Sequence, residues 1–273
     1  MIRRLGFAFN PTRPHTVELR DRAVEWCRSH DLDAWSAEAN DYETLTRELA
    51  GTDCLVVLGG DGTFLRAARA LASVDVPVLG VNSGRVGFLS KVDAEAMDAA
   101  LADLLAARYT LEARMMLGAS FDGETHVALN DAAIVRGAQV RLVTLEVAVD
   151  ESHLATWLAD GVVVATPTGS TAYSFSAGGP ILDPTSRNLV VTPIAAYLAA
   201  IRSIVVGPSH RVVVRVLEGR DCLLSIDGRE DHPLEIGSVV EVRALERPLR
   251  LVEPAGAVPF WELLRRKAAL LPS

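Results

Sequence analysis

The sequence predicts an α/β N-terminal domain with a mostly parallel sheet, followed by a β-rich C-terminal domain. Short apolar stretches alternate with amphipathic stretches over residues 1–108, which is typical of βαβ units. Over residues 109–258 the helical periods fade, and apolar and polar residues alternate as in half-exposed antiparallel strands. A last amphipathic stretch, residues 259–271, is expected to form a helix that packs back on the first domain.

The first domain is expected to alternate strands and helices. Residues 54–58 form a continuous apolar run, which predicts a central strand buried on both faces. A helix that Thr63 caps should follow it, because apolar residues then recur at helical spacing. The other expected strands are 5–9, 33–37 and 76–81, and the other expected helices are 16–29, 42–49 and 94–107.

The second domain is expected to consist mainly of antiparallel strands. Residues 140–149 show the clearest alternation, which places one face of the strand on a core and the other in solvent. The expected strands are 111–121, 126–135, 140–149, 162–166, 212–217 and 239–244.

Composition narrows the class of function. The 273 residues carry a formal net charge of −8 at pH 7, which argues against a nucleic-acid-binding protein. No apolar run reaches membrane-spanning length, the N-terminus lacks a signal-peptide core, and the three cysteines have no metal-ligand spacing. We therefore expect a cytoplasmic protein with reduced core cysteines and with neither a nucleic-acid nor a membrane partner.

A glycine turn follows the central strand. Gly59, Gly60 and Gly62 permit a tight turn and a close backbone approach to a ligand. Together with the start of a helix at Thr63 they predict an anion site, because free N–H groups and the positive helix end face a phosphate. The turn lacks the Gly-Lys-Ser/Thr ending of a P-loop, and Leu65 stands where a dinucleotide fingerprint has its third glycine.

Asp61 lies in the middle of this turn, where its carboxylate would repel a phosphate. Two chemical explanations are open: Asp61 holds Mg²⁺ between phosphates, or it accepts a proton from an attacking hydroxyl. A third explanation is that Asp61 only shapes the turn, since Asp is common in turns.

Residues 160–176 form a second candidate ligand-binding segment. An apolar strand leads into Gly169, which permits an unusual backbone angle, and Tyr173, whose ring offers a face for stacking. This set suits a nucleoside, but an ordinary surface loop rich in Ser, Thr and Gly has the same composition. The hydroxylated side chains are Thr166, Thr168, Ser170, Thr171, Ser174 and Ser176.

A third candidate is the pair Asn130-Asp131, which interrupts an apolar stretch. Polar side chains in such a strand are unfavourable unless hydrogen bonds satisfy them. Two interpretations are open. Either the pair only stabilises a bulge or turn, or its amide and carboxylate hydrogen-bond to the two hydroxyls of a ribose.

Together these motifs resemble the NAD kinase family. Its pattern is a Gly-Gly-Asp-Gly-Thr turn, an Asn-Glu or Asn-Asp pair, and a long segment ending in Thr-Pro-Thr-Gly-Ser-Thr-Ala-Tyr-Ser. Here the three stand in that order at residues 59–63, 130–131 and 160–176, and residues 84–89 resemble the family's Gly-x-Leu/Val-Gly-Phe-Leu loop. The third motif is the most specific, since lipid kinases and phosphofructokinases share a similar glycine turn. The family's two-domain fold with a C-terminal return agrees with the division above.

The resemblance implies that ATP gives its γ-phosphate to the 2′-hydroxyl of the adenosine ribose of NAD⁺, with Asp61 as the proton acceptor. Asn130 and Asp131 would then lie at the ribose, and Asp160 would contact the dinucleotide across a subunit boundary. Residues 171–176 would line the adenine pocket, and two arginines would neutralise phosphates. The implied nucleotide-binding residues are Gly59, Gly60, Gly62, Thr63, Arg66, Asn130, Asp131, Arg141, Asp160, Thr171, Ala172, Tyr173, Ser174 and Ser176.

The resemblance also implies Mg²⁺, or another divalent cation, on the donor phosphates, and a homodimer or homotetramer. No residue is assigned as a metal ligand. One departure is Asp227-Gly228-Arg229, where the family often has Asp-Gly-Gln, so the contact of that Gln is not carried over. Polyphosphate as the donor, NADH as an acceptor and feedback by NADPH stay open.

Two other functions share part of the pattern. A lipid kinase of the diacylglycerol or sphingosine type has a similar glycine turn, but the hydroxylated segment and Asn130-Asp131 favour a sugar over a lipid tail. A non-catalytic nucleotide-binding regulator would keep the pocket, but the intact Asp61 argues against it.

Overall fold

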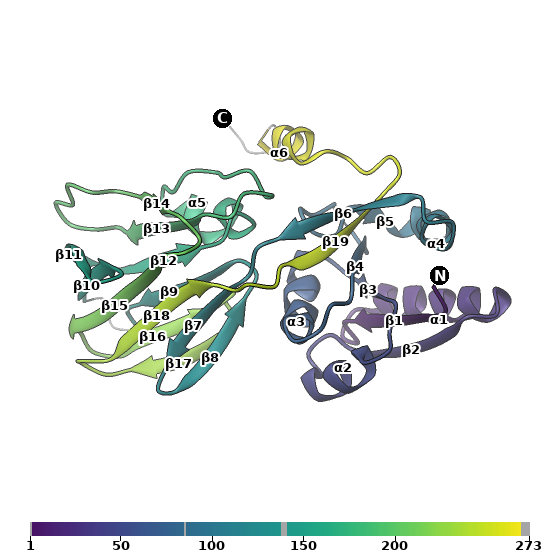
Figure 1. Cartoon of the computed structure of the whole chain (residues 1–273), viewed down its shortest axis with the longest axis horizontal. Coiled ribbons are helices and arrows are strands. Elements are labelled where there is room, and N and C mark those ends of the chain that lie inside the picture. Colours follow the sequence, from purple (N-terminus) through teal and green to yellow (C-terminus); the bar gives the residue numbers. More distant parts are fainter. Residues whose placement is uncertain (1, 85, 138–140, 269–273) are drawn as a thin grey trace. The chain divides into compact units, whose positions relative to one another are not determined.

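The computed structural model describes residues 2–84, 86–137 and 141–268, and the chain divides into two compact units (Figure 1). One unit contains the described residues up to Ala113 and those from Leu249 onward, and the other is Arg114–Pro248. We expected boundaries after residues 108 and 258. These differ from the contact-based boundaries because β6 (Tyr109–Arg114) and β19 (Leu249–Pro254) belong to the sheet of the first unit.

Over the described residues, the first unit contains a seven-stranded sheet in the order β2-β1-β3-β4-β19-β6, with the short β5 beside β4. Neighbouring strands from β2 to β19 pair in parallel, as does β5 with β4. The mostly parallel sheet expected from the alternation of strands and helices is therefore confirmed. The remaining strands are β1 (Arg4–Phe9), β2 (Asp33–Glu38), β3 (Cys54–Leu58), β4 (Val78–Asn82) and β5 (Val92–Asp93).

Helices cover this sheet. Cys54, Val56 and Leu58 of β3 pack in one core with α1 and α4, whereas α2 packs against α3. Every residue of β3 is buried, as predicted for a strand covered on both faces. The helices are α1 (Pro14–Ser29), α2 (Tyr42–Leu49), α3 (Asp61–Leu71), α4 (Met97–Leu105), which the short 3₁₀ turn Ala94–Ala96 precedes, and α6 (Phe260–Ala268).

The prediction that Thr63 caps α3 is wrong. The helix begins at Asp61 with Gly60 as its N-cap, so Thr63 lies inside the first turn. There the Thr63 side chain packs against Gly59, whose φ is +151°. A Cβ on Gly59 would lie 2.6 Å from Thr63 Oγ1. Both the backbone angle and the close approach therefore require glycine at position 59.

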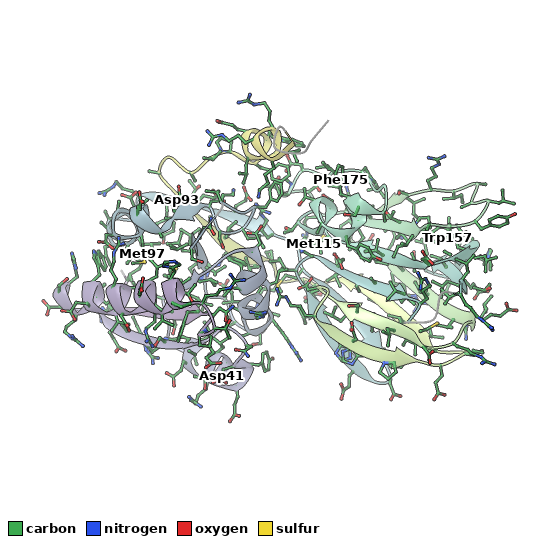
Figure 2. The ribbon with its side chains drawn as sticks, turned by 180° about the vertical axis from the view of Figure 1, so that it is seen from behind. Asp41, Asp93, Met97, Met115, Trp157 and Phe175 are labelled. Atoms are coloured by element: carbon green, nitrogen blue, oxygen red, sulfur yellow. The ribbon has the colours of Figure 1, made fainter. Side chains whose placement is uncertain are left out.

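The second unit contains two six-stranded sheets over its described residues, β11-β10-β15-β18-β7-β8 and β14-β13-β12-β9-β16-β17. A shared apolar core between them includes Met115 and Trp157 (Figure 2). The strands are β7 (Leu117–Phe121), β8 (Glu124–Ala128), β9 (Asp131–Val135), β10 (Val143–Val149), β11 (Ser152–Ala159), β12 (Gly161–Ala165), β13 (Leu189–Ile194), β14 (Ile204–Val206), β15 (Arg211–Glu218), β16 (Cys222–Ile226), β17 (Glu230–Leu234) and β18 (Val239–Ala244).

Strand β12 shows how the second sheet buries both of its faces. Val162 and Val164 point into the core between the two sheets. Val163 and Ala165 point the other way and form a smaller apolar cluster with Ala133 of β9. A short helix, α5 (Tyr173–Ser176), follows β12 after the 3₁₀ turn Gly169–Thr171, and both α5 and Ala177 pack on this outer face. The candidate ligand-binding segment is therefore placed on the outer face of the second sheet.

Two predicted strands are each divided between different sheets. Residues 111–121 become β6 and β7, and residues 126–135 become β8 and β9. Met115 and Met116 at the first crossing are both buried, so the apolar pattern continues although the chain changes sheet. The predicted strand 140–149 begins at Val143, and residue 140 lies outside the described residues.

The last described helix, α6, starts at Phe260, whose ring lies 5.6 Å from that of Phe88 between centroids. The expected end of this helix, residues 269–271, lies outside the described residues. In the part of the chain that the structure describes, every helix is too short or too polar to span a membrane.

Candidate active site

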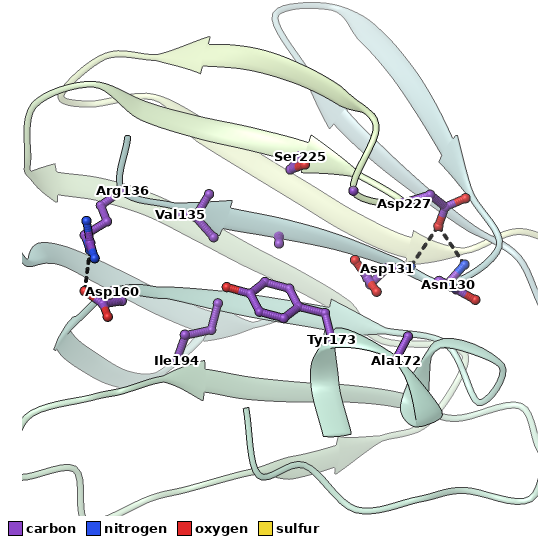
Figure 3. Close-up of a pocket in the computed structure, with 12 residues that line it drawn as sticks. Asn130, Asp131, Val135, Arg136, Asp160, Ala172, Tyr173, Ile194, Ser225 and Asp227 are labelled. Atoms are coloured by element: carbon purple, nitrogen blue, oxygen red, sulfur yellow. Dashed lines mark hydrogen bonds and ion pairs between the residues drawn. The ribbon is translucent and has the colours of Figure 1, made fainter. Parts of the chain in front are cut away.

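A pocket of about 450 Å³ lies on the outer face of the second sheet (Figure 3). It gathers residues from β9, from α5 and from the turn after β16, which are far apart in the sequence. The residues that line it are Asn130, Asp131, Ala133, Val135, Arg136, Asp160, Ala172, Tyr173, Ile194, Ser225, Asp227 and Gly228.

The period of a β-strand explains how β9 contributes to the pocket. Asp131, Ala133 and Val135 alternate along β9 and therefore share its outer face. Tyr173 begins α5, and its ring extends across the pocket from Ala172 towards Asp160 (Figure 3). The Tyr173 side chain is 42% exposed, so one face of the ring is available to a planar ligand.

Two carboxyl groups lie at one end of the pocket. The Asp227 carboxylate accepts hydrogen bonds from the backbone N–H groups of Leu129 at 3.0 Å, Asn130 at 2.7 Å and Asp131 at 3.1 Å. Burial raises the pKa of Asp227, although these N–H donors act in the opposite direction. Burial, with a smaller effect of the Asp227 charge, raises the pKa of Asp131 to about 7. Asp131 can therefore either donate or accept a hydrogen bond near neutral pH.

An ion pair lies at the other end of the pocket. The Arg136 Nε lies 2.5 Å from Asp160 Oδ1, and both side chains are partly buried. Figure 3 shows the pair across the pocket from the two carboxyl groups. Burial, followed by the charges of Asp131 and Asp160, raises the pKa of Tyr173. The pocket thus combines an aromatic ring with charged groups of both signs.

A second cluster lies in the first unit, at the carboxyl ends of β3 and β4. The two strands are neighbours and parallel, and the Gly59 N–H donates to the Val81 carbonyl at 2.8 Å. The glycine turn and the loop after Asn82 therefore meet at the edge where ligands bind in parallel sheets. The N-terminus of α3, with Gly60 as its N-cap, lies at this edge, and the Thr63 N–H in its first turn donates to the Gly60 carbonyl at 2.8 Å.

The Asp61 carboxylate is held by the loop after β4. Asp61 Oδ2 accepts a hydrogen bond from the Phe88 N–H at 2.8 Å, and Oδ1 accepts from Leu89 at 3.0 Å and Ser90 at 3.1 Å. The loop approaches so closely that a Cβ on Gly87 would lie 1.9 Å from Asp61 Oδ1. Asp61 therefore does more than shape its own turn, because it organises a second loop.

The structure brings only part of the expected set together in the pocket. Asn130, Asp131, Asp160, Ala172 and Tyr173 line it. The glycine turn with Asp61 and Thr63 belongs to the other unit, where Arg66 is exposed on α3. Four more expected residues lie outside this lining. Arg141 is exposed before β10. The other three make local hydrogen bonds: Thr171 donates to the Thr168 carbonyl, Ser174 shares a hydrogen bond with Thr192, and Ser176 donates to the Ala172 carbonyl.

Several lining residues were not expected from the sequence. Ala133 and Val135 follow Asp131 with a period of two, so strand alternation could have indicated them. Asp227 belongs to the Asp-Gly motif quoted above, but it was given no place in the site. Gly228 belongs to the same motif and was likewise given no place. Arg136, Ile194 and Ser225 carry no local signal, because only the folded sheet brings them to the pocket.

Two family models match most of this chain. The family model of the ATP-NAD kinase N-terminal domain matches residues 4–109, and that of the ATP-NAD kinase C-terminal domain matches residues 129–254. The NAD kinase of Symbiobacterium thermophilum is 48% identical over 221 residues, covering 79% of this chain and 78% of that protein. The NAD kinase of Syntrophotalea carbinolica is 35% identical, covering 97% of this chain and 98% of that protein.

Solved structures show the same fold. The yeast NADH kinase complexed with NADH matches with a TM-score of 0.82 and 25% identity, covering 98% of this chain and 87% of that chain. An NAD kinase from Archaeoglobus fulgidus in complex with ATP matches with a TM-score of 0.80 and 23% identity, covering 98% of this chain and 100% of that chain.

Proposed function

The chain belongs to the NAD kinase family and is an NAD⁺ kinase, and on that premise we propose how its residues divide the work. ATP gives its γ-phosphate to the 2′-hydroxyl of the adenosine ribose of NAD⁺, and Asp61 accepts the proton. The observation that carries this proposal is the pocket in which Asn130, Asp131 and Tyr173 converge. The relatives named above are NAD kinases, so the lipid-kinase and regulator alternatives have no support among them.

The pocket in the second unit is the proposed site for the adenosine part of NAD⁺. The half-exposed Tyr173 ring offers a face to the base, and Asn130 and Asp131 offer an amide and a carboxyl group to the ribose hydroxyls. Ala172 lines the same wall, and Asp160 is proposed to contact the dinucleotide from its pair with Arg136. Thr171, Ser174 and Ser176 are proposed to shape the adenine segment through their own hydrogen bonds.

The glycine turn is the proposed site for the donor phosphates. Gly60 and Gly62 are proposed to present their backbone N–H groups, with the positive end of α3, to the phosphates. Gly59 and Thr63 are proposed to shape the turn, since their own N–H groups donate to the Val81 and Gly60 carbonyls. Two exposed basic side chains, Arg66 on α3 and Arg141 before β10, are proposed to neutralise phosphate oxygens. The description of the family models as ATP-NAD kinase supports ATP as the donor.

Asp61 Oδ2 is the proposed proton acceptor. A carboxylate has about four lone-pair sites, two on each oxygen. Oδ1 accepts from two backbone N–H groups, whereas Oδ2 accepts from the Phe88 N–H and keeps a site for a hydroxyl. As the 2′-oxygen bonds to the γ-phosphorus, the bond from phosphorus to the ADP oxygen breaks and the hydroxyl proton moves to Oδ2.

A divalent cation, Mg²⁺ in our proposal, accompanies the donor. Within the residues that the structure describes, His, Cys, Asp and Glu side chains form no group of three or more that could hold a metal ion. The proposed cation would be held mainly by phosphate oxygens and water, as Mg²⁺ commonly is. When bound, such a cation neutralises charge on the phosphates.

Assembly and location are proposed as well. A homodimer or homotetramer would cover apolar side chains that now face solvent, Leu198 at 84% and Tyr197 at 64% exposure. The three cysteines are buried and unpaired, which supports a reducing compartment and therefore the cytoplasm. The mass in solution, measured by light scattering, tests the oligomer, and a monomer at working concentration would contradict it.

A coupled assay tests the reaction. Purified protein is mixed with NAD⁺, Mg²⁺ and ATP, and the product is detected with a dehydrogenase that accepts NADP⁺ but not NAD⁺. Formation of NADP⁺ is expected, and the specificity of the coupling enzyme reports a 2′-phosphate. Parallel reactions with polyphosphate or with NADH identify the donor and the acceptor. NAD⁺ binding without product from either donor would contradict the catalytic assignment.

A further inference from the structure

The loop at residues 86–91 is fixed to the first unit through its backbone. The N–H groups of Phe88, Leu89 and Ser90 donate to the Asp61 carboxylate, and the Gly87 N–H donates to the Ser90 carbonyl at 3.1 Å. The loop also lies directly on β4, where a Cβ on Gly80 would be 2.5 Å from the Leu89 carbonyl oxygen. Movement of this loop would therefore move the N–H donors that orient Asp61.

The side chains of the same loop reach segments from the C-terminal part of the chain. Lys91 Nζ lies 2.5 Å from Glu253 Oε1 of β19, and the two side chains are only 5% and 14% exposed. The Phe88 ring packs at 41° against the ring of Phe260, the first residue of α6. The ammonium group of Lys267, also on α6, lies 5.1 Å from the centroid of the Phe88 ring.

Phe88 thus contacts both Asp61, through its backbone, and α6, through its side chain. Its backbone N–H donates to Asp61 Oδ2, the oxygen that we assign as the proton acceptor. Its side chain is only partly buried and is contacted by two residues of α6. Phe260 is itself buried, 8% exposed, so the aromatic contact is a packed one.

We propose that α6 positions the Asp61 carboxylate through Phe88, and that Phe260 and Lys267 are positioning residues for phosphoryl transfer. The inference rests on the proposed role of Asp61 and adds a requirement for the C-terminal helix. Loss of the ring contact removes a restraint on the loop at residues 86–91, so the loop backbone can shift and carry the Phe88 N–H out of line with Oδ2. Because a misplacement of about 1 Å can lower a rate by roughly 100-fold, the turnover number is the sensitive quantity.

The first test separates turnover from binding. Phe260→Ala is expected to lower kcat by roughly 10- to 100-fold, while KM for NAD⁺ stays within a factor of about two. Phe260→Tyr keeps the ring and should restore most of kcat. Lys267→Ala should lower kcat by a few-fold and Lys267→Arg should not, because the guanidinium keeps the cation–π contact. Arg265→Ala, an exposed position on the same helix, is the control with unchanged kcat.

Hydrogen exchange supplies a readout that general destabilisation would not give. In Phe260→Ala, backbone amides of peptides covering residues 88–90 should exchange faster, while peptides covering β3 keep their wild-type rates. Faster exchange throughout the first unit, or wild-type kcat in Phe260→Ala with its thermal unfolding unchanged, would overturn the inference.

A double-mutant cycle distinguishes this inference from the proposed function. If Phe260 acts through Asp61, Phe260→Ala should have little further effect on kcat in the Asp61→Asn background. If Asp61→Asn alone leaves kcat unchanged, the proposed role of Asp61 fails. If Asp61→Asn lowers kcat and Phe260→Ala multiplies that loss independently, the role of Asp61 stands and only the role of α6 is wrong.

Discussion

Asp61 and Asp227 are held in the same way in two different units. Each carboxylate accepts hydrogen bonds from three consecutive backbone N–H groups, those of residues 88–90 for Asp61 and of 129–131 for Asp227. Their surroundings differ. Asp61 opens α3 at the edge of a parallel sheet, whereas Asp227 lies in the turn after β16 and close to a second carboxyl group, Asp131.

The difference shows that three backbone N–H donors do not by themselves give a carboxylate a chemical role. At Asp227, burial outweighs the N–H donors and raises the pKa, and the charge of Asp227 acts in turn on Asp131. Through its hydrogen bonds to the backbone, Asp227 fixes the start of β9, where Asn130 and Asp131 line the pocket. At Asp61, the positive end of a helix lies beside the three N–H donors. This setting suits a carboxylate that faces the anionic phosphates of ATP. We infer a structural role for Asp227 and a chemical one for Asp61.

The largest expected effect is on turnover. Asp61→Asn should lower kcat by roughly 10²- to 10⁴-fold, because the amide cannot accept the hydroxyl proton. KM for NAD⁺ should change little, since the proposed contacts to the base and the ribose, Tyr173, Asn130 and Asp131, stay unaltered. Steady-state kinetics and NAD⁺ binding by calorimetry measure the two quantities. A variant with wild-type kcat would remove the chemical distinction between the two carboxylates.

Asp227→Ala should act on stability first. The backbone N–H groups of residues 129–131 would lose their buried acceptor. We expect the free energy of unfolding to fall by about 2–4 kcal/mol, as for other buried donors left without partners. Urea unfolding measures this change, with Asp227→Asn as the milder control that keeps one acceptor oxygen. Unchanged stability in Asp227→Ala would contradict the structural role.

The pair Asp131 and Asp227 predicts a pH dependence of stability. The pKa of Asp131 is raised to about 7 in the folded state, whereas an unfolded Asp titrates near 4. The folded state therefore holds an extra proton between these values, so stability falls as pH rises across this window. Asp131→Asn removes the titrating group, and at pH 8 it should be more stable than wild type by roughly 1–4 kcal/mol.

Urea unfolding without nucleotide at pH 8 and at pH 4 tests this sign. At pH 4 the gain from Asp131→Asn should largely disappear, because Asp131 is then protonated in the folded state. A gain that is equal at both pH values would show that repacking, not charge, explains it.

The smallest expected effect concerns the fit of the loop on Asp61. Gly87→Ala places a Cβ 1.9 Å from Asp61 Oδ1, so the loop must shift. We expect kcat to fall by about 10-fold through misplacement of the carboxylate. Gly84→Ala, in the same loop, is the matched control, because its added Cβ meets nothing within 4 Å. Equal rates in both variants would mean that Asp61 tolerates movement of the loop.

Local pattern predicted some features of this molecule well. The buried β3 followed from its continuous apolar run, and the parallel sheet followed from alternating strands and helices. Local pattern failed where the chain changes sheet. Met115 and Met116 are apolar and buried, so nothing in the sequence marks the crossing between β6 and β7.

By itself the sequence determined the order of most elements, the glycine turn and the residues Asn130, Asp131 and Tyr173 that line the pocket, because each depends on neighbours within a few positions. Only the tertiary structure decided that Asp227 accepts hydrogen bonds from the start of β9, and that Phe88 contacts both Asp61 and Phe260. These contacts join residues that are far apart in the chain. A single sequence carries no periodic signal for such contacts, so only the folded backbone brings their partners within hydrogen-bond distance.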